Sequence, residues 1–331
     1  MSVSVSDLVV SIASPQDAAA MIEVIHSAFG ARPRVDPPSD ADEETAETLA
    51  AKLRRGSGII AQVEGRPAGV IVVLPDPDGA GTARFSRVSV HPDLQQHGIA
   101  STMVAAAEEL AAIRGFERVE LLARTEFPEF IVFWQHRGFV VDRQVHHGVM
   151  LAKPLPLAIK VPTSEAMGRL GERLAKFLER GDVILAGGDL GAGKTTLTQG
   201  IGRGLGSEGP VISPTFVLSR IHPSRIGRPT LMHVDAYRLA TASELDDLDL
   251  DAAVADSITV VEWGQGIADG LSDARLEIDI WTSEGDSMAA SDDSERVVTI
   301  RPVGSRWRAV DLSVLRPEGP GGVDHDGVDH D

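Results

Sequence analysis

A glycine-rich stretch near the middle of the chain has the residue types needed to hold phosphate groups. Glycines let the backbone curl so that successive N–H groups point at phosphate oxygens, and a following helix adds its positive N-terminus. Lys194 would reach the terminal phosphates, and the hydroxyl of Thr195 would bind magnesium. The predicted phosphate-binding residues are Gly188, Leu190, Gly191, Ala192, Gly193, Lys194, Thr195 and Thr196.

Two acidic residues at the ends of later strands are candidates for completing this site. Asp235 follows the predicted strand 229–234, and Glu262 lies near the end of the predicted strand 258–263. A carboxylate is expected to approach magnesium from the end of a neighbouring strand. One acid could bind the metal and the other could order the attacking water. Either acid alone could also be a capping residue or a solvated strand end.

The identity of the nucleotide base can be narrowed by exclusion. Guanine-specific proteins with this type of loop use an Asn/Thr-Lys-x-Asp motif further along the chain. No lysine follows Lys194 in this sequence, so that motif is missing. The sequence therefore favours ATP over GTP as the nucleotide that the loop binds.

Four short stretches of the second half together resemble the TsaE family. They are GDLGAGKTT from Gly188, SPTFVL from Ser213, HVDAYRL from His233 and VEWG from Val261. The resemblance extends over roughly residues 161–315. It implies that ATP binds to 190–196 and that Thr195 and Glu262 hold magnesium. It also implies that Asp235 lies near the terminal phosphate, that Thr215 makes a switch-like contact, and that Trp263 belongs to the family pattern.

The TsaE resemblance also implies partners and an activity. Proteins of this family are ATPases that serve threonylcarbamoyladenosine synthesis on bacterial tRNA, and they sustain turnover of the TsaD–TsaB complex. The catalytic residues implied are Lys194, Asp235, Glu262 and Thr215. The formal net charge of −18 argues against a surface that grips nucleic acid directly. We therefore expect tRNA to be reached through the TsaD and TsaB homologues.

The first half contains a weaker motif, Gln95-x-x-Gly98-x-Ala100, between a predicted strand, 83–90, and a predicted helix, 99–115. Together with FWQHRGF from Phe133, it resembles the GNAT acetyltransferases over about residues 3–155. The resemblance implies that backbone groups at the motif wrap the pyrophosphate of acetyl-CoA and that the strand residues lie along the pantetheine arm. The residues implied are Gln95, Gln96, His97, Gly98, Ile99 and Ala100, with Val88 and Val90 on the strand.

The first half departs from the GNAT pattern where that family often has a proton donor. Trp134 occupies the usual tyrosine position, and an indole N–H has no pKa suitable for general acid catalysis. The chain also lacks asparagine altogether. Asp93 and His97 are candidate bases for an amine substrate. Both an active acetyltransferase and a catalytically silent scaffold remain open from the sequence.

The elements that must position these residues indicate two α/β domains. Residues 1–155 are expected to form a GNAT-like mixed sheet with helices, and 163–315 a P-loop NTPase sheet flanked by helices. Proline-rich residues 156–162 are expected to be a linker, and the acidic tail 316–331 to be disordered. Further expectations are a helix at 38–56, a hairpin turning at 64–66, one closing strand at 143–155 and an acidic helix at 243–256.

Composition excludes several other classes of protein. Cysteine is absent, which removes disulfides, thiolate metal sites and cysteine catalysis. No apolar run approaches the length of a membrane helix and no secretory signal is evident, so we expect a cytoplasmic protein without membrane contact. Two further functions stay open. One is an N-acetyltransferase with a regulatory ATPase half, and the other is a small-molecule kinase.

Overall fold

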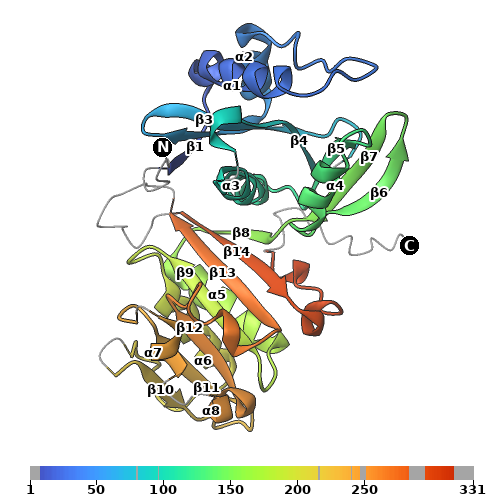
Figure 1. Cartoon of the computed structure of the whole chain (residues 1–331). Helices are drawn as coiled ribbons and strands as arrows, with labels where there is room; N and C mark the ends of the chain where they lie inside the picture. The colour runs from blue at the N-terminus through green and yellow to red at the C-terminus, as the bar shows by residue number, and fades with distance from the viewer. Residues whose placement is uncertain are drawn as a thin grey trace, which may run out of the picture. The chain divides into compact units, whose positions relative to one another are not determined.

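The computed structural model divides the chain into two compact units, residues 1–156 and 157–331 (Figure 1). The described residues are 8–79, 81–95, 97–214, 217–239, 241–246, 251–282 and 295–316. Each unit contains a mixed β-sheet with helices packed against it, which confirms the predicted α/β class. Within these ranges, no helix combines the length and the apolar character needed to cross a membrane.

In the described part of the first unit, seven strands form one sheet in the order β1-β2-β3-β4-β5-β7-β6. Neighbouring strands are antiparallel except β4 and β5, which are parallel. The strands are β1 (Leu8–Ile12), β2 (Ser57–Val63), β3 (Arg66–Pro75), β4 (Thr82–Val90), β5 (Arg118–Arg124), β6 (Val140–Val145) and β7 (Gly148–Pro154).

Helices cover both faces of this sheet, and Figure 1 shows α1 and α2 on one side and α3 on the other. Successive strand residues point to opposite faces. Val70 and Val72 of β3 therefore pack with α1 and α2, and Ile71 and Val73 pack with α3. Burial on both faces explains the unbroken apolar run in β3. The helices are α1 (Ala18–Gly30), α2 (Ala46–Arg55), α3 (Ile99–Ile113) and α4 (Pro128–Gln135).

Three local predictions for the first unit have different outcomes. The β2–β3 hairpin turns where predicted, with positive φ at Glu64 (51°) and Gly65 (74°). The helix predicted over 38–56 begins only at Ala46, because the side chain of Thr45 caps it by accepting a hydrogen bond from the Thr48 amide. The single closing strand predicted over 143–155 is wrong, because β6 and β7 form a hairpin there.

Strand β4 stops pairing with β5 part of the way along and then carries an irregularity in its pairing with β3. Val70 and Val72 of β3 pair with Ser89 and Ser86, so β4 contains one extra residue in this stretch, a β-bulge. Within the bulge, Arg87 has a φ of 53°. Pairing between β4 and β5 is confined to 82–84 and 118–120. The rest of β5 pairs only with β7, so pairing between the two parallel strands ends at Arg84, just before the bulge.

Seven strands also form the sheet of the second unit's described part, in the order β10-β11-β12-β9-β13-β14-β8. The central strands β11, β12, β9 and β13 are parallel, and the outer pairs are antiparallel. The strands are β8 (Leu157–Val161), β9 (Val183–Gly188), β10 (Ser219–His222), β11 (Thr230–Asp235), β12 (Ser257–Glu262), β13 (Arg275–Thr282) and β14 (Arg296–Val303).

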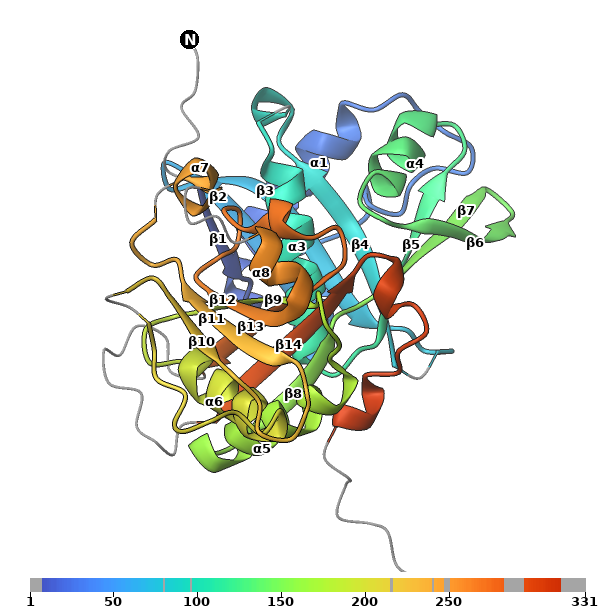
Figure 2. The same cartoon turned by 90° about the horizontal axis from the view of Figure 1, so that it is seen from below.

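Helices α5 and α6 lie side by side against this sheet (Figure 2). They approach closely because Gly168 and Gly200 face each other, and a Cβ on Gly200 would overlap the Gly168 carbonyl group. The acidic helix predicted over 243–256 is represented by two short helices, and residues 247–250 between them lie outside the described residues. The helices are α5 (Ser164–Leu174), α6 (Lys194–Gly204), α7 (Ala242–Asp246) and α8 (Asp251–Asp256).

The predicted linker, 156–162, contains strand β8, which pairs with β14 at the edge of the second sheet. Ile159 and Val161 are 4% and 2% exposed and belong to the core beneath α5 and α6. This burial is the physical reason for a strand at these positions, although prolines flank it. Most of the predicted acidic tail, from 317 onwards, lies outside the described residues.

Candidate functional site

The predicted phosphate loop lies between β9 and α6, at the carboxyl edge of the parallel strands. Gly188 and Gly193 have φ values of 125° and 114°, which residues with a Cβ rarely adopt. Gly193 is the N-cap of α6, so the first amide groups of the helix have no partner within the helix and face the loop. Leu190, 86% exposed, lies at the surface, and Ala192 is buried beneath the loop.

Lys194 is buried and lies inside this loop. Its Nζ donates hydrogen bonds to the carbonyl oxygens of Gly188 (2.6 Å) and Asp189 (2.8 Å). Burial lowers the pKa of the Lys194 ammonium. Three carboxylates oppose this shift, those of Glu262, Asp189 and Asp235. The lysine charge is therefore held within the curl of the backbone where phosphate oxygens would bind.

Thr195 and Glu262 are in direct contact. Thr195 Oγ1 donates to Glu262 Oε1 and Oε2 at 3.0 and 3.1 Å. Glu262 ends β12, which pairs with β9, the strand that leads into the loop. A hydroxyl and a carboxylate are hard oxygen donors of the kind Mg²⁺ uses, and Mg²⁺ usually keeps several waters. These residues therefore fit a magnesium ion, although the described residues contain no cluster of three or more acidic or histidine metal ligands.

Asp235 ends β11, the strand next to β12, and pairs in register with Glu262. The backbone amide of Tyr237 donates to Asp235 Oδ1 (3.0 Å), and Ser213 Oγ donates to Oδ2 (3.5 Å). The two predicted acids therefore occupy adjacent strand ends at one edge of the sheet. Thr215, predicted as a switch-like contact, lies outside the described residues.

His233 is a site residue that the sequence analysis did not single out. It is fully buried on β11, and its Nε2 lies 2.8 Å from Glu262 Oε1. It shares a strand face with Asp235, since the two are separated by one residue. The sequence signal that could have identified His233 is the His-x-Asp spacing at the end of the strand, which places both side chains on the same face. The contact fixes the orientation of the Glu262 carboxylate toward Thr195.

Trp263 follows Glu262 in a strained conformation, with a φ of 62°. Its amide donates to the Ala186 carbonyl group (3.0 Å), which fixes the backbone beside β9. The Lys194 ammonium lies 3.6 Å from the centroid of its ring, and the ring of Tyr237 lies 5.2 Å away. The strained backbone thus places an aromatic face against the loop lysine, a favourable cation–π contact.

The second predicted loop, in the first unit, precedes α3. Gly98 is the N-cap of that helix with a φ of 79°, so the loop turns at a glycine in the left-handed region. His97 Nδ1 lies 2.7 Å from the Gln95 carbonyl oxygen, and Gln96 lies outside the described residues. Ile99 and Ala100 form the start of the helix, where backbone amides are free to bind an anion.

Arg137 is a further residue that the sequence analysis missed. Its guanidinium donates to Ser101 Oγ in the first turn of α3 and to the Phe133 carbonyl group (2.8 Å). This contact brings a positive charge to the N-terminus of α3, beside the predicted pyrophosphate loop. Arg137 belongs to the quoted FWQHRGF stretch, but its contact with Ser101 could not be read from the sequence because it depends on the tertiary fold.

The structure places Trp134 in the hydrophobic core. It is 6% exposed and makes edge-on contacts with the rings of Phe133 (5.2 Å) and Phe139 (5.0 Å). Its role is therefore packing. Val88 and Val90, predicted to line the pantetheine arm, lie on β4 at and beyond the bulge.

Comparison with known proteins gives a separate result for each unit. The family model described as "Threonylcarbamoyl adenosine biosynthesis protein TsaE" matches residues 161–290. The model of the acetyltransferase (GNAT) family matches residues 21–139. Together the two matches cover both predicted loops and the acids at 235 and 262.

Two relatives and one solved structure illustrate these matches. The tRNA threonylcarbamoyladenosine biosynthesis protein TsaE of Streptomyces coelicolor is 51% identical over 150 residues, 45% of this chain and 99% of that protein. The protein of that name from Mycobacterium bovis is 48% identical over 125 residues, 36% of this chain and 74% of that protein. A PaiA N-acetyltransferase from Thermoplasma acidophilum, solved with coenzyme A, is 18% identical with a TM-score of 0.40, covering 45% of this chain and 99% of that one.

Proposed function

Because the chain belongs to the TsaE family, we propose that its second unit is a magnesium-dependent ATPase serving threonylcarbamoyladenosine modification of tRNA. The observation that carries this proposal is the double hydrogen bond from Thr195 Oγ1 to the Glu262 carboxylate. It joins the hydroxyl that follows the loop lysine to an acid on the adjacent strand. That pair is the donor set expected for magnesium beside a bound triphosphate.

Each side chain has a defined task in the proposed reaction. Lys194 exchanges the carbonyl oxygens of Gly188 and Asp189 for phosphate oxygens, because its ammonium already lies within the loop. Thr195 and Glu262 would hold magnesium, and the ion would offset the charge that develops on the phosphates. Asp235, on the next strand end, orients the attacking water. His233 keeps the Glu262 carboxylate turned toward Thr195.

The proposed partners are homologues of TsaD and TsaB, and ATP hydrolysis would sustain turnover of their complex. The support for indirect contact with tRNA is electrostatic. The net charge of −18 opposes direct binding to a polyanion. The protein therefore leaves tRNA handling to its partners.

A deletion in the cell tests the role in tRNA modification. Removing residues 161–315 from the cell's copy should eliminate threonylcarbamoyladenosine from bulk tRNA, measured by nucleoside analysis. The full chain should restore it, and a Lys194→Ala chain should not. Lys176→Ala removes an exposed lysine of the same unit and should restore it fully. Normal modification after the deletion, in a cell with no second copy of the ATPase, would sink the proposal.

The first unit supports a second function, binding of acetyl-CoA with transfer of the acetyl group to an amine. The specific observation is the combination of the Gly98 turn before α3 with the end of pairing between β4 and β5. The turn would present backbone amides and Arg137 to a pyrophosphate, and the part of β4 that does not pair with β5 would lie along the thioester arm. If this activity is the principal one, the ATPase half is regulatory.

Substitution at Gly98 tests the second function. Gly98→Val should weaken acetyl-CoA binding by about tenfold or more in calorimetric titrations, because a β-branched residue strains a φ of 79°. Gly30→Ala is the matched control, since its Cβ would meet open space. Equal affinity for acetyl-CoA in both variants would contradict the assignment of the loop before α3 as the acetyl-CoA site.

The remaining alternative, a small-molecule kinase, concerns the second unit. A phosphorylated product in place of free phosphate would identify that unit as a kinase.

A further inference from the structure

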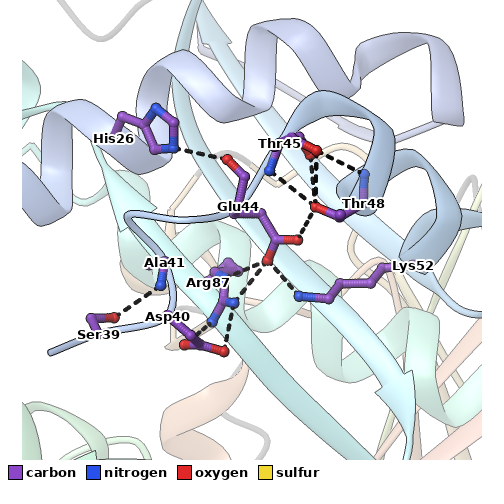
Figure 3. A network of polar contacts seen from close by, with 9 residues as sticks. All are labelled: His26, Ser39, Asp40, Ala41, Glu44, Thr45, Thr48, Lys52 and Arg87. Atoms are coloured by element: carbon purple, nitrogen blue, oxygen red, sulfur yellow. Dashed lines mark hydrogen bonds and ion pairs between the residues drawn. The ribbon is translucent and has the colours of Figure 1, made fainter. Parts of the chain in front are cut away.

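The segment between α1 and α2, residues 31–45, crosses from β4 to β5 where these strands are no longer paired. On the β4 side it is held by Arg87, the bulge residue. The Arg87 guanidinium donates to Asp40 (3.0 and 3.1 Å) and to the buried carboxylate of Glu44 (2.8 Å). Figure 3 shows Arg87 and Lys52 converging on Glu44 from two sides. These contacts fix one end of the segment to β4.

The same segment is fixed to β5 by Arg124, the last residue of that strand. Its guanidinium donates to the carbonyl oxygens of Pro37 (2.8 Å) and Asp36 (3.1 Å). Since one arginine comes from each strand, the segment bridges β4 and β5 where the two strands are no longer paired.

Arg32 lies at the start of this segment, and its side chain reaches the backbone of β4. Its Nη2 lies 3.4 Å from the carbonyl oxygen of Val88, in the part of β4 that does not pair with β5. The guanidinium rests against two aromatic rings, those of Phe29 (4.0 Å to the centroid) and Phe130 of α4 (4.9 Å). Desolvation in this aromatic setting lowers the pKa of Arg32.

Arg32 differs in its charge balance from the two arginines that hold the segment to the strands. Arg87 is paired with Asp40 and Glu44, and Arg124 with Glu126. Among the described residues, no carboxylate lies within ion-pairing distance of Arg32, and no charged group offsets the effect of burial on its pKa. A partly buried cation without a counterion favours an anion from outside, and a guanidinium matches a carboxylate with two parallel hydrogen bonds.

We propose that Arg32 binds the carboxylate of the acetyl acceptor, which is therefore a small molecule or peptide carrying an amine and a carboxylate. This inference rests on the proposed binding of acetyl-CoA by the first unit. In the transfer, the amine nitrogen bonds to the thioester carbonyl carbon and the carbon–sulfur bond breaks. The amine gives up one proton and the departing thiolate takes one up, so the products are an N-acetylated acid and CoA.

Binding of product-like probes to the full chain tests this site. With CoA saturating, N-acetylglycine, N-acetyl-β-alanine and N-acetyl-γ-aminobutyrate are titrated calorimetrically beside their neutral amides. At least one acid should bind tenfold or more tightly than its amide. Arg32→Gln should remove that preference. Arg66→Gln, which deletes an exposed arginine at the β2–β3 turn, should keep it. An equal preference in Arg32→Gln, or no acid preferred by the wild-type chain, overturns the proposal.

Two further measurements separate this proposal from the one on which it rests. Titration with CoA alone decides whether the first unit binds the carrier. If CoA does not bind, the acetyl-CoA proposal fails, and the acid–amide comparison without CoA still decides the role of Arg32.

A measurement on the wild-type chain avoids the risk that a substituted chain misfolds. The Nε–Hε magnetic resonance signal of Arg32 should shift with the acid and stay in place with the amide, and the reverse pattern overturns the site.

Discussion

The two units use the same backbone device and differ in the side chains that surround it. In each, a glycine with positive φ ends a loop and caps a helix, Gly193 before α6 and Gly98 before α3. In the second unit, Lys194 lies in the loop and Thr195 contacts Glu262. The loop before α3 supplies no charged side chain of this kind. A glycine turn before a helix therefore predicts an anion site in both units. The charged side chains around the turn distinguish the proposed nucleotide site of the second unit from the proposed acetyl-CoA site of the first.

The largest expected effect is on nucleotide binding by the second unit. Lys194→Ala should weaken ATP binding by about 100-fold, because it removes a charge-assisted contact to the phosphates. Calorimetric titration of the full chain measures this. Lys176→Ala should bind ATP as the wild type does, and normal affinity in Lys194→Ala would end the loop assignment. Acetyl-CoA binding should be unchanged in both variants, which tests whether the two loops are independent.

The next effect concerns the metal-dependent step. Glu262→Gln should lower the magnesium-dependent rate of ATP hydrolysis by about 100-fold or more, since it removes the charge that holds the ion. ATP binding without magnesium should persist. Asp235→Asn is the matched change on the adjacent strand and should lower the rate with little effect on the magnesium concentration needed. If Asp235→Asn raises that concentration and Glu262→Gln does not, the two roles are exchanged.

In the first unit, a large effect on stability is expected at the bulge. Arg87→Ala should cost about 2–3 kcal/mol of local stability, because it removes the guanidinium from the buried Glu44 carboxylate. Hydrogen–deuterium exchange of the full chain should be faster in peptides from α2 and β4. Exchange in β9 and β12, which belong to the second unit, should be unchanged. Arg66→Ala, at an exposed turn, should leave exchange unchanged. Equal protection in Arg87→Ala would mean that the network does not stabilise the bulge.

The smallest effect is a pH dependence confined to the first unit. Burial of the Glu44 carboxyl group would raise its pKa, but hydrogen bonds from Lys52 and Thr48 and the charge of Arg87 bring it below the usual 4.5. A lowered folded pKa gives stability that is complete above the unfolded value and declines as pH falls through the folded value. Exchange protection of α2, corrected for intrinsic rates, should therefore decline below about pH 4.5.

Glu44→Gln is the control for this pH dependence. It should be less stable at neutral pH, where the lost charge contributes most, and it should show a flatter response to acid. A decline of the same steepness in Glu44→Gln would assign the pH dependence to other carboxylates, such as Asp40, whose pKa is also lowered.

The sequence was most informative for candidate site residues that lie at or just after the ends of predicted strands. Lys194, Thr195, Asp235 and Glu262 follow strands whose apolar runs are readable, and parallel strands bring their carboxyl ends to one edge. Periodicity also predicted the α/β class of both units. The β6–β7 hairpin was missed because His146-His147 lacks the Asn-Gly or Asp-Gly signal of a two-residue turn.

Residues that act through the tertiary fold could not be predicted. Arg32 lies more than fifty positions before Val88, and only the packing of α1 and α4 brings it there. Arg137 reaches Ser101 for the same kind of reason. The position of Trp134 could be read from the sequence, but its burial between Phe133 and Phe139 could not, since an aromatic run fits a binding wall as well as a core.

Strand β8 has a practical consequence for fragments of this protein. A fragment of the second unit that starts at Thr163, after the apparent linker, would lack the strand that covers β14. An uncovered edge strand presents free backbone donors and acceptors and is a template for aggregation. Its core would also lose Ile159 and Val161. Fragments intended for expression should therefore begin before Leu157, within the proline-flanked stretch that looks dispensable in the sequence.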